Sequence, residues 1–202
     1  MKRNRPLNQD KRESILAAAI EEFYTKGYEG SSMDTVSKEA NVSKATVYNH
    51  FNNKEELFLA IATILKERFE NSFDYIYSKE TPLDIQLREI ASKEMFFLNS
   101  EENIKLLRTV TIVMMQKNAI GLKILEMTKD ECMLMTSKWF DDAKVDKKLT
   151  FKSSTFVSQQ FIGMLKSFAF LPQIYGAPLL SEDEQNKVID ETVDMILKLY
   201  TK

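Results

Sequence analysis

The stretch from residue 31 to residue 58, SSMDTVSKEANVSKATVYNHFNNKEELF, constrains the fold of this chain more than any other. Ser32 and Ser43 each precede a short helical pattern, and serine is a favoured N-cap because its hydroxyl accepts a bond from a free backbone N–H. Asn41 separates the two patterns and tolerates a positive φ better than most residues. The stretch therefore predicts two short helices joined by a tight turn. A further helix should follow, capped by Asn53 with Glu56 at capping-box spacing.

The second of these helices, KATVYNHF at residues 44–51, has two sides of different chemistry. Val47 and Phe51 lie four residues apart and are expected to point inward. The opposite side carries a cation, a phenol, an amide and small side chains, which suit the base-pair edges of a DNA major groove. In a helix-turn-helix the second helix enters that groove with its N-terminal residues at the bases. A solvated helical hairpin without a ligand has a similar pattern, so both interpretations stand at this point.

We predict that the DNA-contacting residues come from this helix and from the start of the next one. Lys44 can reach a phosphate or a guanine edge, Asn49 can pair with adenine, and the small side chains can touch a thymine methyl. His50 is expected to contact the DNA backbone or to pack between helices, and Lys54 is expected to anchor a phosphate. The predicted set is Lys44, Ala45, Thr46, Tyr48, Asn49, His50 and Lys54.

Residues 12–58 as a whole resemble the DNA-binding domain of the TetR family of transcriptional repressors. The matching motifs are R-x-x-I-L-x-A-A-x-x-x-F at residues 12–23, K-G-Y-E-G-S-S-M at residues 26–33 and A-N-V-S-K-A-T-V-Y-N-H-F-x-N-K-E-E-L-F at residues 40–58. The chain departs from the family at Asn41 and Ala45, where glycine is common in relatives. Asp34 stands where some relatives carry a DNA-contacting arginine. Because an acid there would repel phosphate, we assign Asp34 to helix capping.

The charge distribution has the sign expected for a DNA-binding N-terminal part, although the signal is weak. Residues 1–54 contain nine Lys and Arg against seven Asp and Glu, a net of +2. The remaining residues contain nineteen against twenty-three, a net of −4, which agrees with the formal charge of −2 for the whole chain. The basic residues 1–5, MKRNR, are either a disordered terminus or an arm that contacts phosphates or the minor groove.

The composition disfavours several other classes of protein. A single cysteine, Cys132, excludes an internal disulfide, and with His50 as the only histidine there is no sign of a metal site or a nucleophile–base pair. We therefore expect no enzyme activity, no metal and no cofactor. Cys132 is interpreted as a buried small hydrophobe, with a thiol sensor as the alternative. Because the chain has no signal peptide and no apolar run of about 18 residues, we expect a cytoplasmic protein without a membrane partner.

The sparse glycine (5) and proline (4) favour long helices and predict an all-α fold of about nine helices. We expect a helix-turn-helix domain at residues 1–54, including the basic arm, and a helical domain at residues 55–202. The first helix should end at Gly27. Later helices are expected at about 54–77, 82–99, 101–117, from a break at Gly121 to about 142, and at 151–171 and 182–200. Residues 101–117 are apolar on most sides, which indicates a buried helix.

The family resemblance implies that the C-terminal domain senses a ligand. The chain contains ten methionines, many of them in the middle helices, where aromatic residues join them. Methionine is deformable and suits an adaptable apolar pocket, although any one methionine is more simply explained as core. The predicted pocket residues are Phe96, Met114, Met115, Gln116, Met135, Trp139, Gln160 and Met164.

The resemblance also implies a homodimer in which the last two long helices pair with those of the partner. Both helices carry wide apolar stripes, and Gly163 would permit close approach of a second helix. Two recognition helices about 34 Å apart would read both halves of a palindromic operator. The alternative is that these stripes are buried within one chain. The predicted interface residues are Phe156, Gly163, Ser167, Phe170, Val193 and Ile196.

These features predict a homodimeric repressor of double-stranded operator DNA that is released by a small, largely apolar inducer. Ligand binding would move the helix at residues 54–77 and so favour a form that does not bind DNA. The alternative is a helical DNA-binding regulator without a ligand, acting as an activator or an adaptor module.

Overall fold

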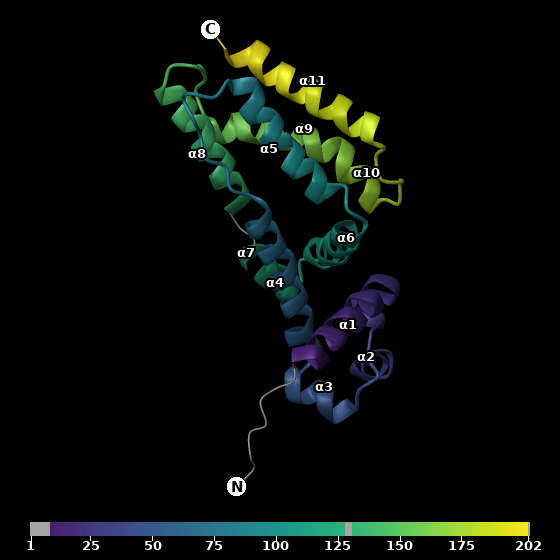
Figure 1. The fold of residues 1–202 in the computed structure, drawn as a ribbon. Coiled ribbons are helices and arrows are strands. Elements are labelled where there is room, and N and C mark those ends of the chain that lie inside the picture. Colours follow the sequence, from purple (N-terminus) through teal and green to yellow (C-terminus); the bar gives the residue numbers. More distant parts are fainter. Residues whose placement is uncertain (1–8, 128–130, 202) are drawn as a thin grey trace. The chain divides into compact units, whose positions relative to one another are not determined.

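The computed structural model describes residues 9–127 and 131–201, so the basic arm at residues 1–5 lies outside the described residues. The side chains of residues 131–133, which include Cys132 and Met133, also lie outside them. Within the described residues the chain forms eleven helices and no strand, which confirms the all-α prediction but exceeds the expected nine (Figure 1). The helices are α1 Gln9–Gly30, α2 Met33–Glu39, α3 Lys44–His50, α4 Lys54–Ser72, α5 Leu83–Leu98, α6 Glu101–Met115, α7 Ala119–Met127, α8 Glu131–Val145, α9 Ser154–Ala169, α10 Leu171–Ile174 and α11 Glu182–Tyr200.

The chain divides into two compact units by its contacts. The first unit contains residues up to 66 together with residues 105–127, and the second contains residues 67–104 and the part of the chain from residue 128 onward. Helices α4 and α6 each contribute residues to both units. The predicted boundary between the two functional domains, after residue 54, coincides with the start of α4. The division by contacts falls after residue 66 instead, so the predicted functional boundary stays a prediction.

The core of the first unit joins α1, α2, α3 and the start of α4. The ring of Phe23 on α1 packs edge-on against Phe58 on α4, with centroids 5.0 Å apart, and Tyr28 lies 5.2 Å from the same ring. Burial of a side chain of this size stabilises the fold by roughly 1.5–3 kcal/mol relative to exposure. These rings fix the start of α4 against α1. The other buried apolar residues here are Ile15, Leu16, Ala19, Met33, Val36, Val47, Phe51 and Leu57.

The helical path of α1 breaks at Gly27, as the sequence predicts. Its backbone has φ 70° and ψ 169°, a conformation that a residue with a Cβ rarely adopts. The break lets the chain turn, and the hydroxyl of Ser31 then donates a 2.6 Å hydrogen bond to the carbonyl of Gly27. The turn leads the chain to the cap of α2 at Ser32.

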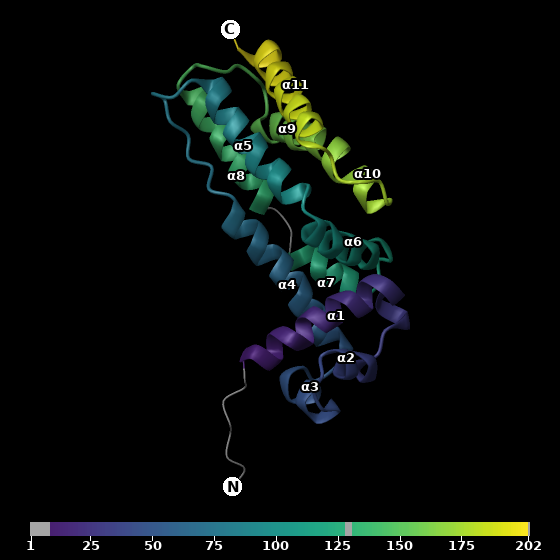
Figure 2. The ribbon, with the colours of Figure 1, turned by 45° about the vertical axis from the view of Figure 1, so that its right-hand side comes forward.

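The second unit is a helical bundle in which α9 contacts α5, α8, α10 and α11 (Figures 1 and 2). Its core contains Trp139 and Phe140 on α8, edge-on at 5.2 Å, and Phe161 on α9, edge-on to Phe140 at 6.0 Å. Helix α11 packs on both α5 and α9. Arg88 on α5 forms ion pairs with Asp190 and Asp194 along the rim of this packing. The described helices carry no segment long and apolar enough to cross a bilayer.

Helix α4 ends at Ser72, five residues earlier than the predicted end near residue 77. Residues 73–77 have no helical assignment, and a single buried amide, that of Gln86, anchors the chain that follows them. Gln86 Oε1 accepts bonds from the backbone N–H of Ser78 at 2.8 Å and from Trp139 Nε1 at 3.3 Å. Gln86 Nε2 donates to the carbonyls of Ser78 at 2.7 Å and Thr81 at 2.8 Å. These bonds hold residues 78–81 beside α5, and because apolar periodicity carries no sign of such side-chain bonds, it alone could not locate the end of α4.

Two predictions about residues 101–121 were wrong. Helix α6 is amphipathic and not buried all round, because Leu106, Val110 and Val113 are buried whereas Ile112 and Met115 are exposed. Gly121 lies inside α7 and does not break a helix. A Cβ at Gly121 would lie 2.5 Å from the carbonyl oxygen of Val113, so this glycine permits a close approach between α7 and the end of α6.

Candidate nucleic-acid interface

The turn between α2 and α3 has the predicted geometry. The hydroxyl oxygen of Ser32 accepts a bond from the backbone N–H of Thr35 at 3.1 Å, and that of Ser43 accepts from Thr46 at 3.1 Å. Asn41 has φ 52°, in the left-handed region that permits the tight turn. Both predicted N-caps and the predicted turn are therefore confirmed.

The start of α4 is capped slightly differently from the prediction. The Oδ1 atom of Asn53 accepts a 2.8 Å bond from the backbone N–H of Glu56, which confirms the cap. The Glu56 carboxylate does not return to Asn53, however. It accepts bonds from the backbone N–H of Asn52 at 2.9 Å and from its side-chain amide at 2.7 Å.

Helix α3 presents the predicted polar side to solvent. Val47 and Phe51 are buried in the core, whereas Lys44, Ala45 and Asn49 are exposed. The Tyr48 side chain is 43% exposed, which leaves its phenol available to a ligand. Thr46 is half-buried, and its hydroxyl shares a 2.8 Å hydrogen bond with the Ser43 hydroxyl. The arrangement matches the chemistry of a major-groove reading helix.

Lys44 has an intramolecular partner that the sequence analysis did not predict. Its Nζ lies 2.7 Å from Asp34 Oδ1, and both side chains are more than half exposed. The hydrogen bond to Asp34 raises the pKa of Lys44 above its usual value. An exposed pair of this kind contributes little to stability, so a phosphate can compete for Lys44. Asp34 thus has a second role besides its position in the first turn of α2.

His50 is half-buried beside Phe51, with ring centroids 6.4 Å apart. Burial lowers the pKa of His50, and the charges of Arg12 and Lys11 lower it further. The imidazole is therefore neutral near pH 7. Its Nδ1 atom is buried and has no hydrogen-bond partner among the described residues. The packing alternative predicted for His50 accordingly has structural support, and a contact with the DNA backbone stays a prediction.

Lys54 has a structural role that revises the prediction of a phosphate anchor. Its Nζ donates to the carbonyls of Tyr28 at 2.7 Å and Ser31 at 3.1 Å, with a longer bond to Glu29 at 3.4 Å. It also lies 4.5 Å from the centre of the Tyr28 ring. Three carbonyls use the three donors of the ammonium group. We therefore leave Lys54 out of the DNA-contacting set proposed below.

Helix α6 is tied to α1 within the first unit by two cations. Lys105 Nζ lies 2.5 Å from Glu21 Oε2, and this hydrogen bond lowers the pKa of Glu21. Lys105 and Arg108 also lie over the ring of Tyr24, at 5.1 and 5.6 Å from its centre. Cations on an aromatic face add an attraction of roughly 0.5–1 kcal/mol at exposed sites.

Helix α7 is tied to α4 in the same unit. Lys123 on α7 forms an ion pair with Glu55 in the first turn of α4. The sequence analysis missed these links between α6–α7 and the DNA-binding helices. The only local signal is the three-residue spacing of Lys105 and Arg108, which places both cations on one side of α6.

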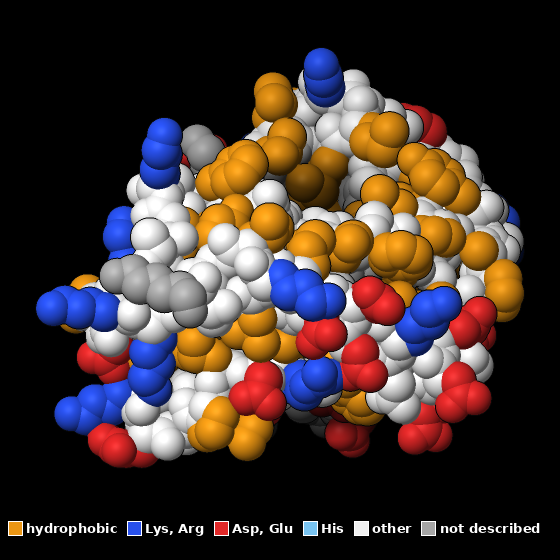
Figure 3. Space-filling view, turned by 90° about the horizontal axis from the view of Figure 1, so that it is seen from above, with side chains coloured by type: hydrophobic (Ala, Val, Ile, Leu, Met, Phe, Trp, Pro, Cys, Tyr) orange, Lys and Arg blue, Asp and Glu red, His pale blue; other side chains and the backbone are white. Residues whose placement is uncertain are grey.

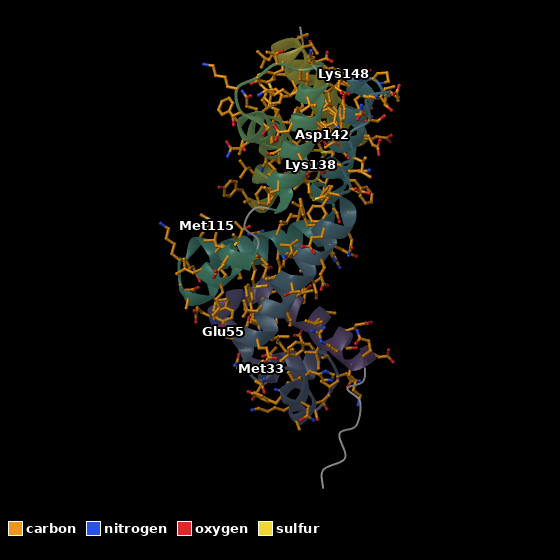
Figure 4. The ribbon with its side chains drawn as sticks, turned by 90° about the vertical axis from the view of Figure 1, so that its left-hand side faces the viewer. Met33, Glu55, Met115, Lys138, Asp142 and Lys148 are labelled. Carbon is orange, nitrogen blue, oxygen red and sulfur yellow. The ribbon has the colours of Figure 1, made fainter. Side chains whose placement is uncertain are left out.

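The predicted pocket residues lie in different surroundings. Phe96 is 82% exposed and Met115 is 71% exposed, so neither lines an enclosed cavity in this structure (Figure 4 shows Met115). Trp139 is buried in the core of the second unit and donates to Gln86. The Gln160 amide oxygen accepts a 2.5 Å bond from the Tyr200 hydroxyl. Of the others, Met114 is half-buried and Gln116 is exposed, whereas Met135 and Met164 line two separate grooves.

The predicted dimer residues fall into two groups. Phe156, Gly163 and Ser167 are exposed on α9, and Phe170 is half-buried. Val193 and Ile196 are fully buried, because the apolar stripe of α11 packs on α5 and α9 of the same chain. For these two residues the alternative of burial within one chain is correct, and they are withdrawn from the interface.

Comparison with known proteins identifies the family. Residues 15–61 match the model of bacterial regulatory proteins of the tetR family. Residues 85–202, more than half of the chain, match the AefR-like transcriptional repressor C-terminal domain. The chain belongs to the TetR family. It is therefore a DNA-binding transcriptional regulator of the helix-turn-helix class, as the sequence predicted.

Individual TetR-family proteins resemble the chain over nearly its whole length. YhgD of Bacillus subtilis, an uncharacterized HTH-type transcriptional regulator, is 26% identical over 95% of this chain and 94% of its own length. The crystal structure of a TetR family transcriptional regulator from Pseudomonas syringae pv. tomato is 35% identical, with a TM-score of 0.81 over 96% of this chain and 99% of that one. AibR, solved with isovaleryl coenzyme A and operator DNA, shares the fold, with a TM-score of 0.65, 20% identity, and coverage of 92% and 97%.

Proposed function

We propose that this TetR-family regulator reads its operator with the exposed side of α3. The observation that carries the proposal is the division of that helix, with Val47 and Phe51 in the core and the polar side free. Lys44 and Asn49 supply groups for phosphate and base edges, and Ala45 and Thr46 supply methyl groups for thymine. Tyr48 supplies a phenol that can bond a phosphate.

The reading unit is a homodimer formed through α9. Large apolar side chains stay exposed along α9 and just beyond it, including Phe156, which is 57% exposed, Phe168 and Leu171. Figure 3 shows apolar side chains gathered on one side of the surface, with charged side chains along another. Gly163 leaves open space where a Cβ would be, which suits the approach of a second helix. Two copies would place two α3 helices on successive major grooves, about 34 Å apart.

The regulator acts as a repressor that a small ligand releases from DNA. AibR, which has the same fold, is known with both a ligand and operator DNA. Helix α6 has residues in both compact units, and its Lys105 and Arg108 hold α1. A ligand that displaces α6 would therefore disturb the helix that supports α2 and α3. Such a ligand acts only by binding the DNA-incompetent form more tightly, with a typical coupling of about 1–3 kcal/mol.

The test uses fluorescence anisotropy with a labelled duplex from upstream of the coding region. The wild-type chain should bind in a salt-dependent manner, and Tyr48→Ala should weaken binding at least about tenfold while the oligomer remains intact by sedimentation. Tyr175→Ala, an exposed tyrosine that follows α10, is the matched control and should bind like the wild type. Equal affinity of Tyr48→Ala and wild type would contradict the placement of α3.

A further inference from the structure

The side chain of Asp34 joins the beginning of α2 to the beginning of α3. The two helices lie side by side in both views of the ribbon (Figures 1 and 2). Asp34 is in the first turn of α2, and its Oδ1 atom lies 2.7 Å from the Nζ atom of Lys44, the first residue of α3. In a helix-turn-helix the N-terminal residues of the second helix face the bases. The Asp34 carboxylate is therefore close to the base-facing end of the reading helix, although it belongs to the other helix.

The Asp34 carboxylate is not needed as the cap of α2, the role that the sequence analysis gave it. Ser32 is that cap, since its hydroxyl oxygen accepts the backbone N–H of Thr35 at 3.1 Å. The Ser37 hydroxyl donates at 2.8 Å to the main-chain carbonyl of Asp34 and not to its carboxylate. The Asp34 side chain is 58% exposed. Because a carboxylate has about four acceptor positions, the contact with Lys44 leaves room for a donor from another molecule.

An acid on this surface lowers the affinity for DNA of every sequence, unless it finds a donor there. The phosphates carry the charge that dominates the affinity, and they repel a carboxylate. In the free protein Lys44 balances the charge of Asp34. The exposed pair is weak, so a phosphate can take Lys44, and the carboxylate then needs a donor from the DNA. A surface that disfavours every duplex without such a donor discriminates between sequences.

The base that best supplies this donor is cytosine. In the major groove, cytosine presents its N4 amino group, from which a carboxylate accepts a hydrogen bond. Adenine also presents an amino group, but its N7 acceptor lies beside that group and would repel a carboxylate. Guanine presents two acceptors, and thymine presents an acceptor and a methyl group. The guanine paired with the cytosine adds acceptors next to the amino group, where the positive charge of Lys44 is favourable.

Glu39, an exposed acid at the end of α2, provides a matched comparison. It follows Asp34 by five residues, which places it roughly 140° around the helix and about 7.5 Å along its axis. Its removal takes away the same charge from the same helix. It does not, however, take away a carboxylate in contact with the first residue of α3.

We propose that Asp34 is a specificity-determining residue, which accepts a hydrogen bond from the N4 amino group of one cytosine in each half of the operator. On DNA, Lys44 turns to a phosphate, and the cytosine replaces it as the donor to Asp34. This inference rests on the proposed function, since it names a base that is read beside the exposed side of α3.

The experiment selects duplexes from a random library with the full-length wild type and with Asp34→Ala, and sequences both pools. The wild-type pool should contain cytosine at one position of each half-site, where the pool from Asp34→Ala should contain all four bases. In anisotropy titrations, replacement of that C·G pair should weaken the wild type about fivefold or more and Asp34→Ala less than about twofold. Glu39→Ala is the control and should keep the preference for cytosine.

A modified base tests the contact at a single atom. N4-methylcytosine still pairs with guanine, but a methyl group replaces the amino hydrogen that faces the major groove. At the selected position it should weaken the wild type about fivefold or more and leave the affinity of Asp34→Ala unchanged. Equal weakening of both proteins, or a preference for cytosine that Asp34→Ala retains, would overturn the proposal.

Circular dichroism checks that Asp34→Ala folds. If it does not fold, Asp34→Asn decides the question, because an amide pairs with adenine through one donor and one acceptor. A shift of the preferred base from cytosine toward adenine in Asp34→Asn supports the contact, and an unchanged preference for cytosine contradicts it.

The two proposals fail in different ways. If Tyr48→Ala loses binding while Asp34→Ala keeps the preference for cytosine, α3 reads the operator and the Asp34 contact fails. If the preference for cytosine depends on Asp34 while Tyr48→Ala binds like the wild type, the Asp34 contact stands and the placement of α3 fails. If the wild type selects no sequence from the library, both proposals fail.

Discussion

The helix-turn-helix is shaped mainly by local caps, whereas the α5–α8–α9–α11 bundle has local caps at Ser153 and Ser181 and, in addition, side-chain bonds between distant parts of the chain. In the helix-turn-helix the bonds are local, since Ser32 and Ser43 each bond a residue three positions on. In the bundle further bonds join distant parts of the chain, since Gln86 bonds Trp139 and Tyr200 bonds Gln160. Local bonds make a small element whose shape follows from its own sequence. Distant bonds make a bundle whose loops and interior are determined only by the complete fold.

The largest expected effect is a loss of stability on replacement of Gln86, whose side chain bonds three other residues of the second unit. Gln86→Ala leaves the backbone groups of Ser78 and Thr81 and the indole N–H of Trp139 without their partner. Because unsatisfied buried groups each cost about 1–3 kcal/mol, we expect a loss of about 3 kcal/mol in the free energy of unfolding. Urea titration followed by the fluorescence of Trp139, the single tryptophan, measures it. The exposed Gln9→Ala should have almost no effect, and an equal loss in both variants would contradict the role of Gln86.

A smaller loss of stability is expected when the N-cap bond of α3, between Ser43 and Thr46, is removed. Ser43→Ala removes the acceptor for the backbone N–H of Thr46 and should cost about 1 kcal/mol of stability. Ser43→Asp retains an oxygen acceptor and should recover most of that loss. Urea titration followed by the helical signal at 222 nm compares the two variants at low and moderate salt. If both variants lose the same stability, the cap does not explain the position of α3.

The smallest expected effect is on the salt dependence of DNA affinity, and it should distinguish Lys44 from Lys54, which the sequence analysis placed together in the DNA-contacting set. Lys44→Ala should lower the slope of log affinity against log salt by about one, because its exposed partner Asp34 yields to a phosphate. Lys54→Ala should leave the slope unchanged and lower the stability, because its ammonium group holds Tyr28 and Ser31. Anisotropy titrations at several salt concentrations measure both slopes. A reduced slope for Lys54→Ala would restore its predicted contact with phosphate.

The sequence predicted the helix-turn-helix well because its determinants are close in the chain. The caps at Ser32 and Ser43 and the turn at Asn41 depend on the preferences of single residues and their immediate neighbours. The inward direction of Val47 and Phe51 follows from helical spacing. The bonds of Lys44 and Lys54 could not be predicted in this way, because their partners lie on other helices.

The second unit shows where prediction from the sequence ends. The helices and the all-α class follow from periodicity and sparse glycine. Periodicity does not, however, show which helix the apolar face of a given helix packs against. Phe96 is therefore exposed although it was placed in a pocket, and Val193 is buried although it was placed in a dimer interface. The burial of Glu94 on α5 was missed because an acid in a helical pattern is normally assigned to solvent.

Gly121 gives the first unit a mechanical property. Without a side chain there, α7 rests directly on the backbone of Val113 and Met114 at the end of α6. The two helices thus pack closely, and each forms an ion pair with another helix of the first unit: α6 with α1 through Lys105 and Glu21, and α7 with α4 through Lys123 and Glu55. A displacement of α6 would therefore be expected to shift α7 with it and to strain both ion pairs together, because the close backbone contact leaves little room for one helix to move alone.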